Sequence, residues 1–257
     1  MKKRIIPSIL LRCGTSVSLS QQFKPWRTVG ALAQQLRLHV RRHCDEILIV
    51  NTDLAGSGTF HCPQRLLSLV RQEVDVPIAY AGGIASETDA AQCINAGFDK
   101  VYMTSLFLDD PSGVQRVASL IGSQSVGVCL PYRRESLESD ALIWDYRTLC
   151  LRHDQSLTDA LASAVAHGAG EILLHDVDRD GSLRGLDLSI LPKLEACNIS
   201  VPVLIAGGAG SSSHISSALA SPVVQGVVAS SIFSLTQETP GTIRAHCEEL
   251  GIPMRRP

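Results

Sequence analysis

The chain repeats its own pattern about 125 positions later, and this repeat narrows the possible folds more than any other feature. Three segments recur in the same order: 45–53 is echoed by 170–178, 76–84 by 201–209, and 101–107 by 227–233. The period is too long for a solenoid, whose units span about 20–50 residues. Each copy is therefore expected to be a multi-element half of one closed structure.

Short apolar runs alternate with segments of helical period along the whole chain. The runs cover roughly 5–11, 46–50, 77–81, 100–104, 125–130, 171–175, 201–206 and 223–229. Runs that are apolar on both faces are typical of parallel strands covered by helices. Between them lie expected helices such as 31–42 and 157–167.

Eight strand–helix units in 257 residues predict an α/β fold, a (βα)8 TIM barrel with a twofold half-barrel repeat. We expect a single domain over 1–257, with half-barrels at about 1–125 and 126–250. A hairpin insertion is expected at about 132–154, because 141–144 and 147–151 have the pattern of two short strands.

Composition excludes several classes of protein. The net charge is −2 and basic runs are short, so nucleic acid is not an expected partner. The sequence contains no stretch of 18 or more apolar residues, so no membrane-spanning helix is expected. The eight cysteines include no C-x-x-C pair, so neither a zinc site nor a redox motif is signalled. No metal and no cofactor are expected. Reduced thiols fit a cytoplasmic location.

Two Gly-Gly turns, each followed by a pair of hydroxyl residues, predict phosphate binding. Glycines between a strand and a helix let backbone N–H groups approach an anion. The residues are Gly82 and Gly83 with Thr104 and Ser105 in the first half, and Gly207, Gly208 and Gly210 with Ser230 and Ser231 in the second. They should lie on opposite sides of the barrel mouth and hold a ligand with two phosphates. The alternative interpretation is that these glycines only make tight turns between a strand and a helix.

Several motifs together resemble the cyclase subunit of imidazole glycerol phosphate synthase, a lyase family of histidine biosynthesis. They are KRIIP at 3–7, GAGEILL at 168–174, DRDG at 178–181, GGAG at 207–210 and ASSIF at 229–233. The resemblance implies that a glutaminase docks at the bottom of the barrel. Ammonia would then pass through the barrel to a bis-phosphorylated ribonucleotide.

The chain departs from this family where the chemistry occurs. The resemblance puts Leu10 and Pro131 at the positions of the two catalytic aspartates, and neither side chain can transfer a proton. A loop lysine is missing at 18–20, and Asn51 replaces an acidic residue. No catalytic residue is therefore predicted at the family positions, and Asp180 and Asp53 are the candidates for a substitute. His175 is expected to be a hydrogen-bonded wall residue.

The opposite end of the barrel keeps the family pattern. The resemblance assigns Arg4, Glu46, Lys100 and Glu171 to a ring of charges that forms an ammonia gate, and it places Asp99 at the partner interface. The alternative is a set of salt bridges that only seals the core. A gate would require a bore lined by small side chains, expected from Ser8, Val50, Ala79, Val128 and Val203.

Three hypotheses follow. In the first, the chain is a divergent paralogue that receives ammonia from a glutaminase within an amidotransferase complex. It binds a phosphorylated small molecule and lacks normal cyclase chemistry. Sugar amidination for surface polysaccharides is one setting for such a complex. In the second, it is a cyclase or lyase of histidine biosynthesis with relocated catalytic groups. In the third, it is a phosphate-binding scaffold.

Overall fold

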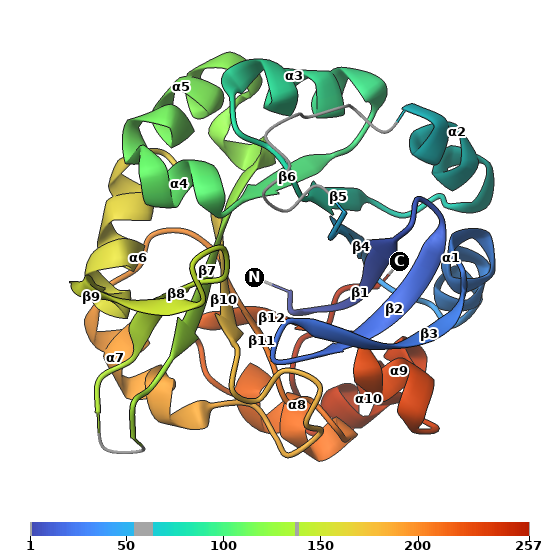
Figure 1. The fold of residues 1–257 in the computed structure, drawn as a ribbon. Coiled ribbons are helices and arrows are strands. Elements are labelled where there is room, and N and C mark those ends of the chain that lie inside the picture. The colour runs from blue at the N-terminus through green and yellow to red at the C-terminus, as the bar shows by residue number, and fades with distance from the viewer. Residues whose placement is uncertain (1, 54–63, 137–138, 257) are drawn as a thin grey trace.

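The protein is a closed barrel of eight parallel strands surrounded by helices (Figure 1). The computed structural model describes residues 2–53, 64–136 and 139–256. The barrel strands are β1 (Arg4–Arg12), β4 (Ile47–Asn51), β5 (Ile78–Ala81), β6 (Lys100–Met103), β7 (Val126–Arg133), β10 (Glu171–Asp176), β11 (Val203–Ala206) and β12 (Val224–Ala229). β1 pairs with both β4 and β12, and β7 pairs with β10, so the sheet closes on itself. The predicted (βα)8 barrel is confirmed.

The two helices expected at 31–42 and 157–167 are present, each within one residue of the expected bounds, and further helices alternate with the strands. They are α1 (Leu32–Arg41), α2 (Gln64–Glu73), α3 (Glu87–Ala96), α4 (Ser105–Asp109), α5 (Pro111–Ile121), α6 (Leu157–Ala166), α7 (Leu191–Ala196), α8 (Ser212–Leu219), α9 (Ser231–Leu235) and α10 (Pro240–Glu249). The Ser86 and Ser156 side chains accept hydrogen bonds from backbone N–H groups in the first turns of α3 and α6. These caps satisfy N–H groups that have no partner within the helix.

The barrel strands separate two apolar layers. Residues such as Ile5, Ile49 and Val126 face the helices, whereas a smaller cluster fills the barrel interior. The interior cluster contains Ile6, Leu48, Ala79, Tyr102, Leu173, Leu204, Ala206 and Val228, with Val50, Ala81 and Cys129 packed against it. No helix in the described part of the chain is long and apolar enough to cross a membrane.

Two of the expected bore residues face the wrong way. Val128 and Val203 are fully buried in the layer between strands and helices, so they do not line the interior. Successive side chains of a strand point to opposite faces, and a one-residue error in register therefore reverses the assignment. Val50 and Ala79 do face the interior, and Ser8 lines the cavity above it.

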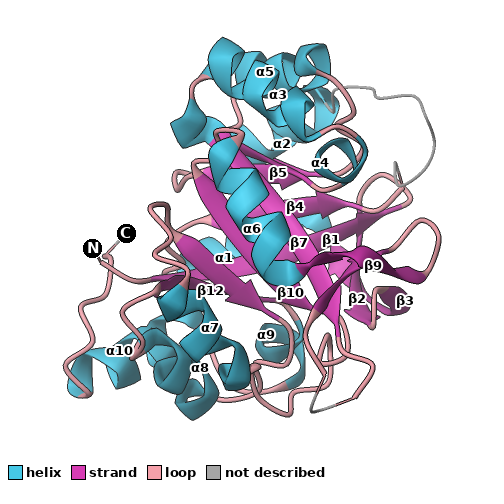
Figure 2. Ribbon diagram, turned by 90° about the vertical axis from the view of Figure 1, so that its left-hand side faces the viewer, coloured by secondary structure: helices cyan, strands magenta, loops and turns pink. Residues whose placement is uncertain are grey.

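A β-hairpin follows the first strand of each half-barrel. β2 (Ser16–Gln21) and β3 (Lys24–Ala31) form the first, and β8 (Leu142–Asp145) and β9 (Cys150–Ser156) the second. β8 begins within one residue of expectation, and β9 three residues later than expected. The sequence pattern missed the first hairpin, because β3 is mostly exposed and has no apolar alternation. Figure 2 shows both hairpins at one end of the barrel, opposite the chain termini.

Candidate functional site

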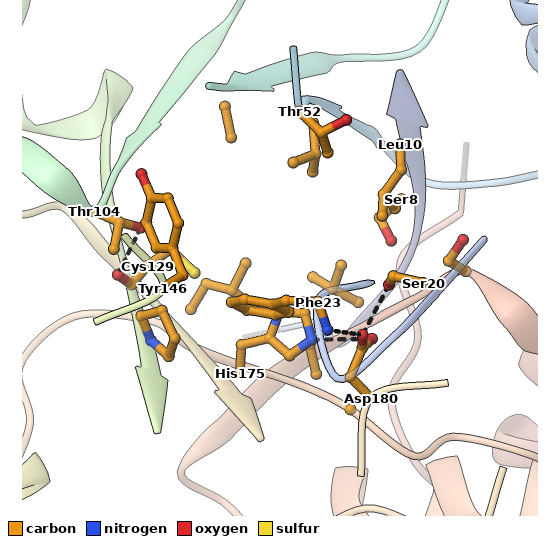
Figure 3. A pocket seen from close by; sticks show the side chains of 18 of the residues that line it. Ser8, Leu10, Ser20, Phe23, Thr52, Thr104, Cys129, Tyr146, His175 and Asp180 are labelled. Atoms are coloured by element: carbon orange, nitrogen blue, oxygen red, sulfur yellow. Dashed lines mark hydrogen bonds and ion pairs between the residues drawn. The ribbon is translucent and has the colours of Figure 1, made fainter. Parts of the chain in front are cut away.

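A cavity of about 740 Å³ occupies the barrel mouth, at the carboxyl ends of the strands. Both Gly-Gly turns line it: Gly82 and Gly83 after β5, and Gly207 and Gly208 after β11. Figure 3 shows side chains from several strands and from the β2–β3 hairpin pointing into this space. The two halves of the repeat therefore contribute equivalent turns to a single cavity.

The local backbone explains why glycine occupies these turns. Gly82 and Gly207 have φ of 125° and 99°, a region that other residues rarely adopt. A Cβ on Gly82 would lie 2.3 Å from the Asn51 carbonyl oxygen, and one on Gly207 would lie 2.3 Å from the Asp176 carbonyl oxygen. Repeat-related residues thus make the same close contact in each half. The turn requires glycine at both positions, whether or not an anion binds there.

The hydroxyl pairs after β6 and β12 also line the cavity: Thr104, Ser105, Ser230 and Ser231. Thr104 Oγ1 donates to the Cys129 carbonyl at 3.0 Å, and the Ser105 hydroxyl is hydrogen-bonded to that of Tyr146, which comes from the second hairpin. Gly210 is not part of the lining, and its N–H donates to His214 Nδ1 at 3.3 Å.

Three lysine and arginine side chains add positive charge to the cavity wall. They are Arg12 at the end of β1, Lys24 at the start of β3 and Arg133 at the end of β7. Arg133 is partly neutralised by Asp178 and stacks over the Trp144 ring at 4.7 Å. Lys24 was not found by sequence reasoning, because the hairpin that carries it was not predicted. The cations and the Gly-Gly turns make this cavity suitable for an anionic ligand.

Leu10 and Pro131 both line the cavity, from β1 and β7 respectively. β1 and β7 are the first strands of the two half-barrels, so Leu10 and Pro131 occupy equivalent places in the two halves. Neither side chain can donate or accept a proton. Asp53 lies at the rim and accepts hydrogen bonds from the N–H groups of Cys13 and Gly14, both at 3.0 Å. Its carboxylate is therefore engaged in holding the turn between β1 and β2.

Asp180 reaches the cavity and is paired with His175. Asp180 Oδ1 lies 3.3 Å from His175 Nε2, and Oδ2 accepts from Ser20 Oγ at 2.8 Å and from the Phe23 N–H at 3.1 Å (Figure 3). Burial alone would lower the pKa of His175, but the bonds to Asp180 and to the Cys129 side chain raise it to about 10. Burial opposes the charged form of Asp180 as well, yet its hydrogen bonds with His175 leave its pKa below the ordinary value. His175 is therefore an imidazolium at neutral pH.

The four charged residues expected at the gate lie together at the amino ends of the strands. Arg4 Nη1 lies 2.8 Å from Glu46 Oε2, and Lys100 Nζ lies 2.6 Å from Glu171 Oε2; Arg4 also pairs with Glu171. Their side chains are 3–7 % exposed, apart from Lys100 at 15 %. Burial would raise the pKa of Glu171, but Lys100 and Arg4 hold it below the ordinary value. Both carboxylates and both cations form one connected network.

Tyr102 fills the barrel interior directly above this network. Its hydroxyl donates to Glu171, and its side chain also lines the floor of the mouth cavity. A Cβ on Gly127, its partner on β7, would lie 2.4 Å from the Tyr102 ring, so glycine makes room for the ring. The expectation of a bore lined only by small side chains is therefore wrong at this level. The feature of the sequence that accompanies this filled interior is the pairing of the aromatic Tyr102 on β6 with Gly127 on β7.

Asp99 precedes Lys100 at the same end of the barrel and is exposed. Its Oδ2 accepts a hydrogen bond from the Ile78 N–H at 2.8 Å, which ties the start of β5 to the start of β6. The described residues contain no group of three or more metal-ligating side chains that could hold a metal ion.

Comparison with known proteins gives two findings. The sequence profile of the family described as "Histidine biosynthesis protein" matches residues 4–239. A putative imidazole glycerol phosphate synthase subunit HisF from Leptospira interrogans is 30 % identical over 234 residues, covering 91 % of this chain and 90 % of that protein. A protein of the same description from Leptospira borgpetersenii is 30 % identical over 236 residues, with the same coverage.

Proposed function

The chain belongs to the histidine biosynthesis protein family, and from this premise we propose that it is the barrel subunit of a glutamine-dependent amidotransferase. In this role it receives ammonia from a glutaminase docked at the amino ends of the barrel strands, beside Asp99. It holds a doubly phosphorylated ligand at the opposite mouth. The observation that carries the proposal is the buried network of Arg4, Glu46, Lys100 and Glu171.

A buried network of ion pairs suits the passage of a neutral molecule. Burying a single charge is costly, and here each charge has at least one partner of opposite sign. Ammonia carries no charge into the barrel interior, whereas ammonium would lose its hydration without compensation. Tyr102 closes the barrel interior above the ion pairs. Passage of ammonia therefore requires the Tyr102 hydroxyl to leave Glu171 and the aromatic side chain to turn toward the cavity.

The mouth supports the ligand part of the proposal. Two Gly-Gly turns face one cavity whose wall also carries Arg12, Lys24 and Arg133. Leu10 and Pro131 supply no acid or base there, which favours a reaction other than the family's cyclisation. Amidination of a phosphorylated sugar for a surface polysaccharide is the specific form we favour, and neighbouring sugar-modifying genes would support it.

The test is reconstitution with a glutaminase subunit encoded beside this chain. We expect the two proteins to co-purify and glutamine hydrolysis to rise when the barrel is added. Lys100→Leu should uncouple hydrolysis from ammonia delivery while docking persists, and Lys193→Leu, on an exposed ion pair with Asp140, is the matched control. A lack of association with any encoded glutaminase would overturn the proposal and leave a phosphate-binding scaffold.

One observation favours a second candidate, a cyclase with a relocated catalytic group. Asp180 is a buried carboxylate at the mouth, next to an imidazolium. We expect the unmodified chain to show no turnover of the family's bis-phosphorylated ribonucleotide, because removing a positioned acid–base group costs about 10² to 10⁴ in rate. Turnover that is abolished by Asp180→Asn would establish this candidate instead.

A further inference from the structure

The repeat gives the mouth of the barrel two corners of the same construction. The first-half corner consists of Gly82, Gly83, Thr104 and Ser105, and the second-half corner of Gly207, Gly208, Ser230 and Ser231; all of them line the cavity. Thr104 and Ser230 have nearly the same backbone, with φ of −120° and −125°, and each directly precedes a short helix. Any difference between the corners therefore comes from what the rest of the chain places against them.

Both hydroxyl groups of the first-half corner are already bonded within the protein. Thr104 Oγ1 donates its single hydrogen to the Cys129 carbonyl at 3.0 Å, so it cannot donate to a ligand as well. The Ser105 hydroxyl is bonded to that of Tyr146, and this contact uses one of their two hydrogens. Figure 3 shows Thr104 and Tyr146 together at one side of the cavity. The first-half corner therefore keeps one hydroxyl hydrogen for a ligand.

The second hairpin holds Tyr146 in this place. The neighbouring Arg147 donates to both carboxylate oxygens of Asp109, at 2.6 and 2.9 Å. Asp109 is the last residue of α4 and Ser105 is the first, so this ion pair joins the hairpin to the same helix. A two-point contact between a guanidinium and a carboxylate fixes orientation as well as distance. Tyr146 is therefore a fixed part of the wall at the first-half corner.

The hydroxyl groups of the second-half corner have no such partners. Neither Ser230 nor Ser231 makes a side-chain hydrogen bond with any residue that the structure describes. Ser231 is only 7 % exposed, yet it borders the cavity. A buried hydroxyl group is costly to leave unpaired, so this position favours a ligand or water that accepts its hydrogen. The second-half corner thus offers two hydroxyl hydrogens where the first-half corner offers one.

Unpaired positive charge lies on the same side of the mouth. The first hairpin starts from β1, and its turn donates from the Phe23 N–H to Asp180, which follows β10. β11 and β12 lie between β1 and β10 in the barrel, so the hairpin passes the strands that carry the second-half corner (Figure 1). Lys24 directly follows the turn, lines the cavity and makes no ion pair with a described residue. Arg133, which begins the second hairpin, is instead paired with Asp178.

We propose that the second-half corner is the principal phosphate site of the mouth, and that a sugar with one phosphate monoester binds there in a single orientation. Its phosphate accepts hydrogen bonds from Ser230 and Ser231 beside the charge of Lys24. Its other end lies toward Ser105 and Tyr146, whose one free hydrogen suits a neutral sugar oxygen. A second phosphate at that end is held more weakly. This orientation rests on the proposed function, which supplies the phosphorylated ligand.

Isothermal titration calorimetry with ribose 5-phosphate tests the orientation. The repeat supplies a matched pair of variants, because Ser231→Ala and Ser105→Ala remove equivalent hydroxyl groups. Ser231→Ala should weaken binding about tenfold, since it removes a hydrogen bond to a charged group. Ser105→Ala should weaken it only about two- to threefold, since a bond to a neutral oxygen contributes less. Ser230→Ala repeats the test with the other hydroxyl of the second-half corner, and the Tm of each variant shows that it is folded.

The charge of Lys24 is tested by the salt dependence of the same titration. Lys24→Gln should weaken the binding of ribose 5-phosphate and make it less sensitive to salt, because ions screen the attraction that the variant lacks. Lys193→Gln, on an exposed ion pair with Asp140, is the matched control and should leave both properties unchanged. An unchanged salt dependence in Lys24→Gln would refute the role of this charge.

Two results would refute the orientation and leave the proposed function standing. One is equal weakening of ribose 5-phosphate binding by Ser231→Ala and Ser105→Ala. The other is binding of fructose 1,6-bisphosphate by a chain that does not bind ribose 5-phosphate, because both corners would then be required. Binding of neither compound at millimolar concentration would overturn the ligand part of the proposed function together with this inference.

Discussion

Glu171→Gln should destabilise the protein strongly, because Glu171 holds the charged network together. Its carboxylate pairs with Arg4 and Lys100 and accepts from the Tyr102 hydroxyl, and its side chain is 3 % exposed. Glutamine keeps the shape and removes the charge, so Lys100 loses its partner and Arg4 keeps only Glu46. Breaking a buried ion pair costs about 3–5 kcal/mol.

For a domain of this size that loss corresponds to a decrease in Tm of roughly 6–20 °C, measured by circular dichroism at pH 7. Glu73→Gln is the matched control: Glu73 pairs with Arg37 at the surface, and its loss should leave the Tm within error. A Tm for Glu171→Gln as high as that of the control would refute the role of Glu171 in holding the network together.

The dependence of the Tm on pH provides a second test of the same variant. The pKa of Glu171 is held below its ordinary value in the folded chain, so its stabilising effect is present above about pH 4.5. That effect is lost as the pH falls through the folded-state pKa. The Tm of the unmodified protein should therefore fall more steeply in acid than that of Glu171→Gln. Parallel curves for the two proteins would contradict the assigned shift.

Three further outcomes test other parts of the structure. Tyr102→Phe removes one buried hydrogen bond to a charged group and should lower the free energy of unfolding by about 1.5–3 kcal/mol in urea titrations; no change would show that the hydroxyl is not bonded as described. The pKa of His175 is raised to about 10, so its stabilising effect is complete below about pH 6.5 and is lost as the pH rises through 10. The difference in Tm between the unmodified protein and His175→Gln should therefore shrink over that pH window. A constant difference would contradict the shift. Gly207→Ala should lower the Tm much more than Gly14→Ala, because a Cβ at Gly207 meets the Asp176 carbonyl while one at Gly14 meets open space; equal decreases would show that the turn can relax.

Much of the architecture was predictable from local pattern. The repeat and the eight apolar runs imply the closed parallel barrel, because strands buried on both faces need helices around them. Strand order also places the Gly-Gly turns at one end, since the carboxyl ends of parallel strands lie together. The charged cluster was reached through family resemblance, and the contacts among Arg4, Glu46, Lys100 and Glu171 are seen only in the structure.

Side-chain direction and long-range pairing were decided by tertiary structure alone. Both faces of a barrel strand are apolar, so the apolar side chains of Val128 and Val203 do not indicate whether they face the interior or the helices. Tyr102 above Glu171, and Cys129 beside His175, depend on which strands become neighbours when the barrel closes. The sequence by itself determined the repeat, the strand–helix alternation and the turn glycines. Closure of the barrel determined which residues meet, because those contacts join segments far apart in the chain.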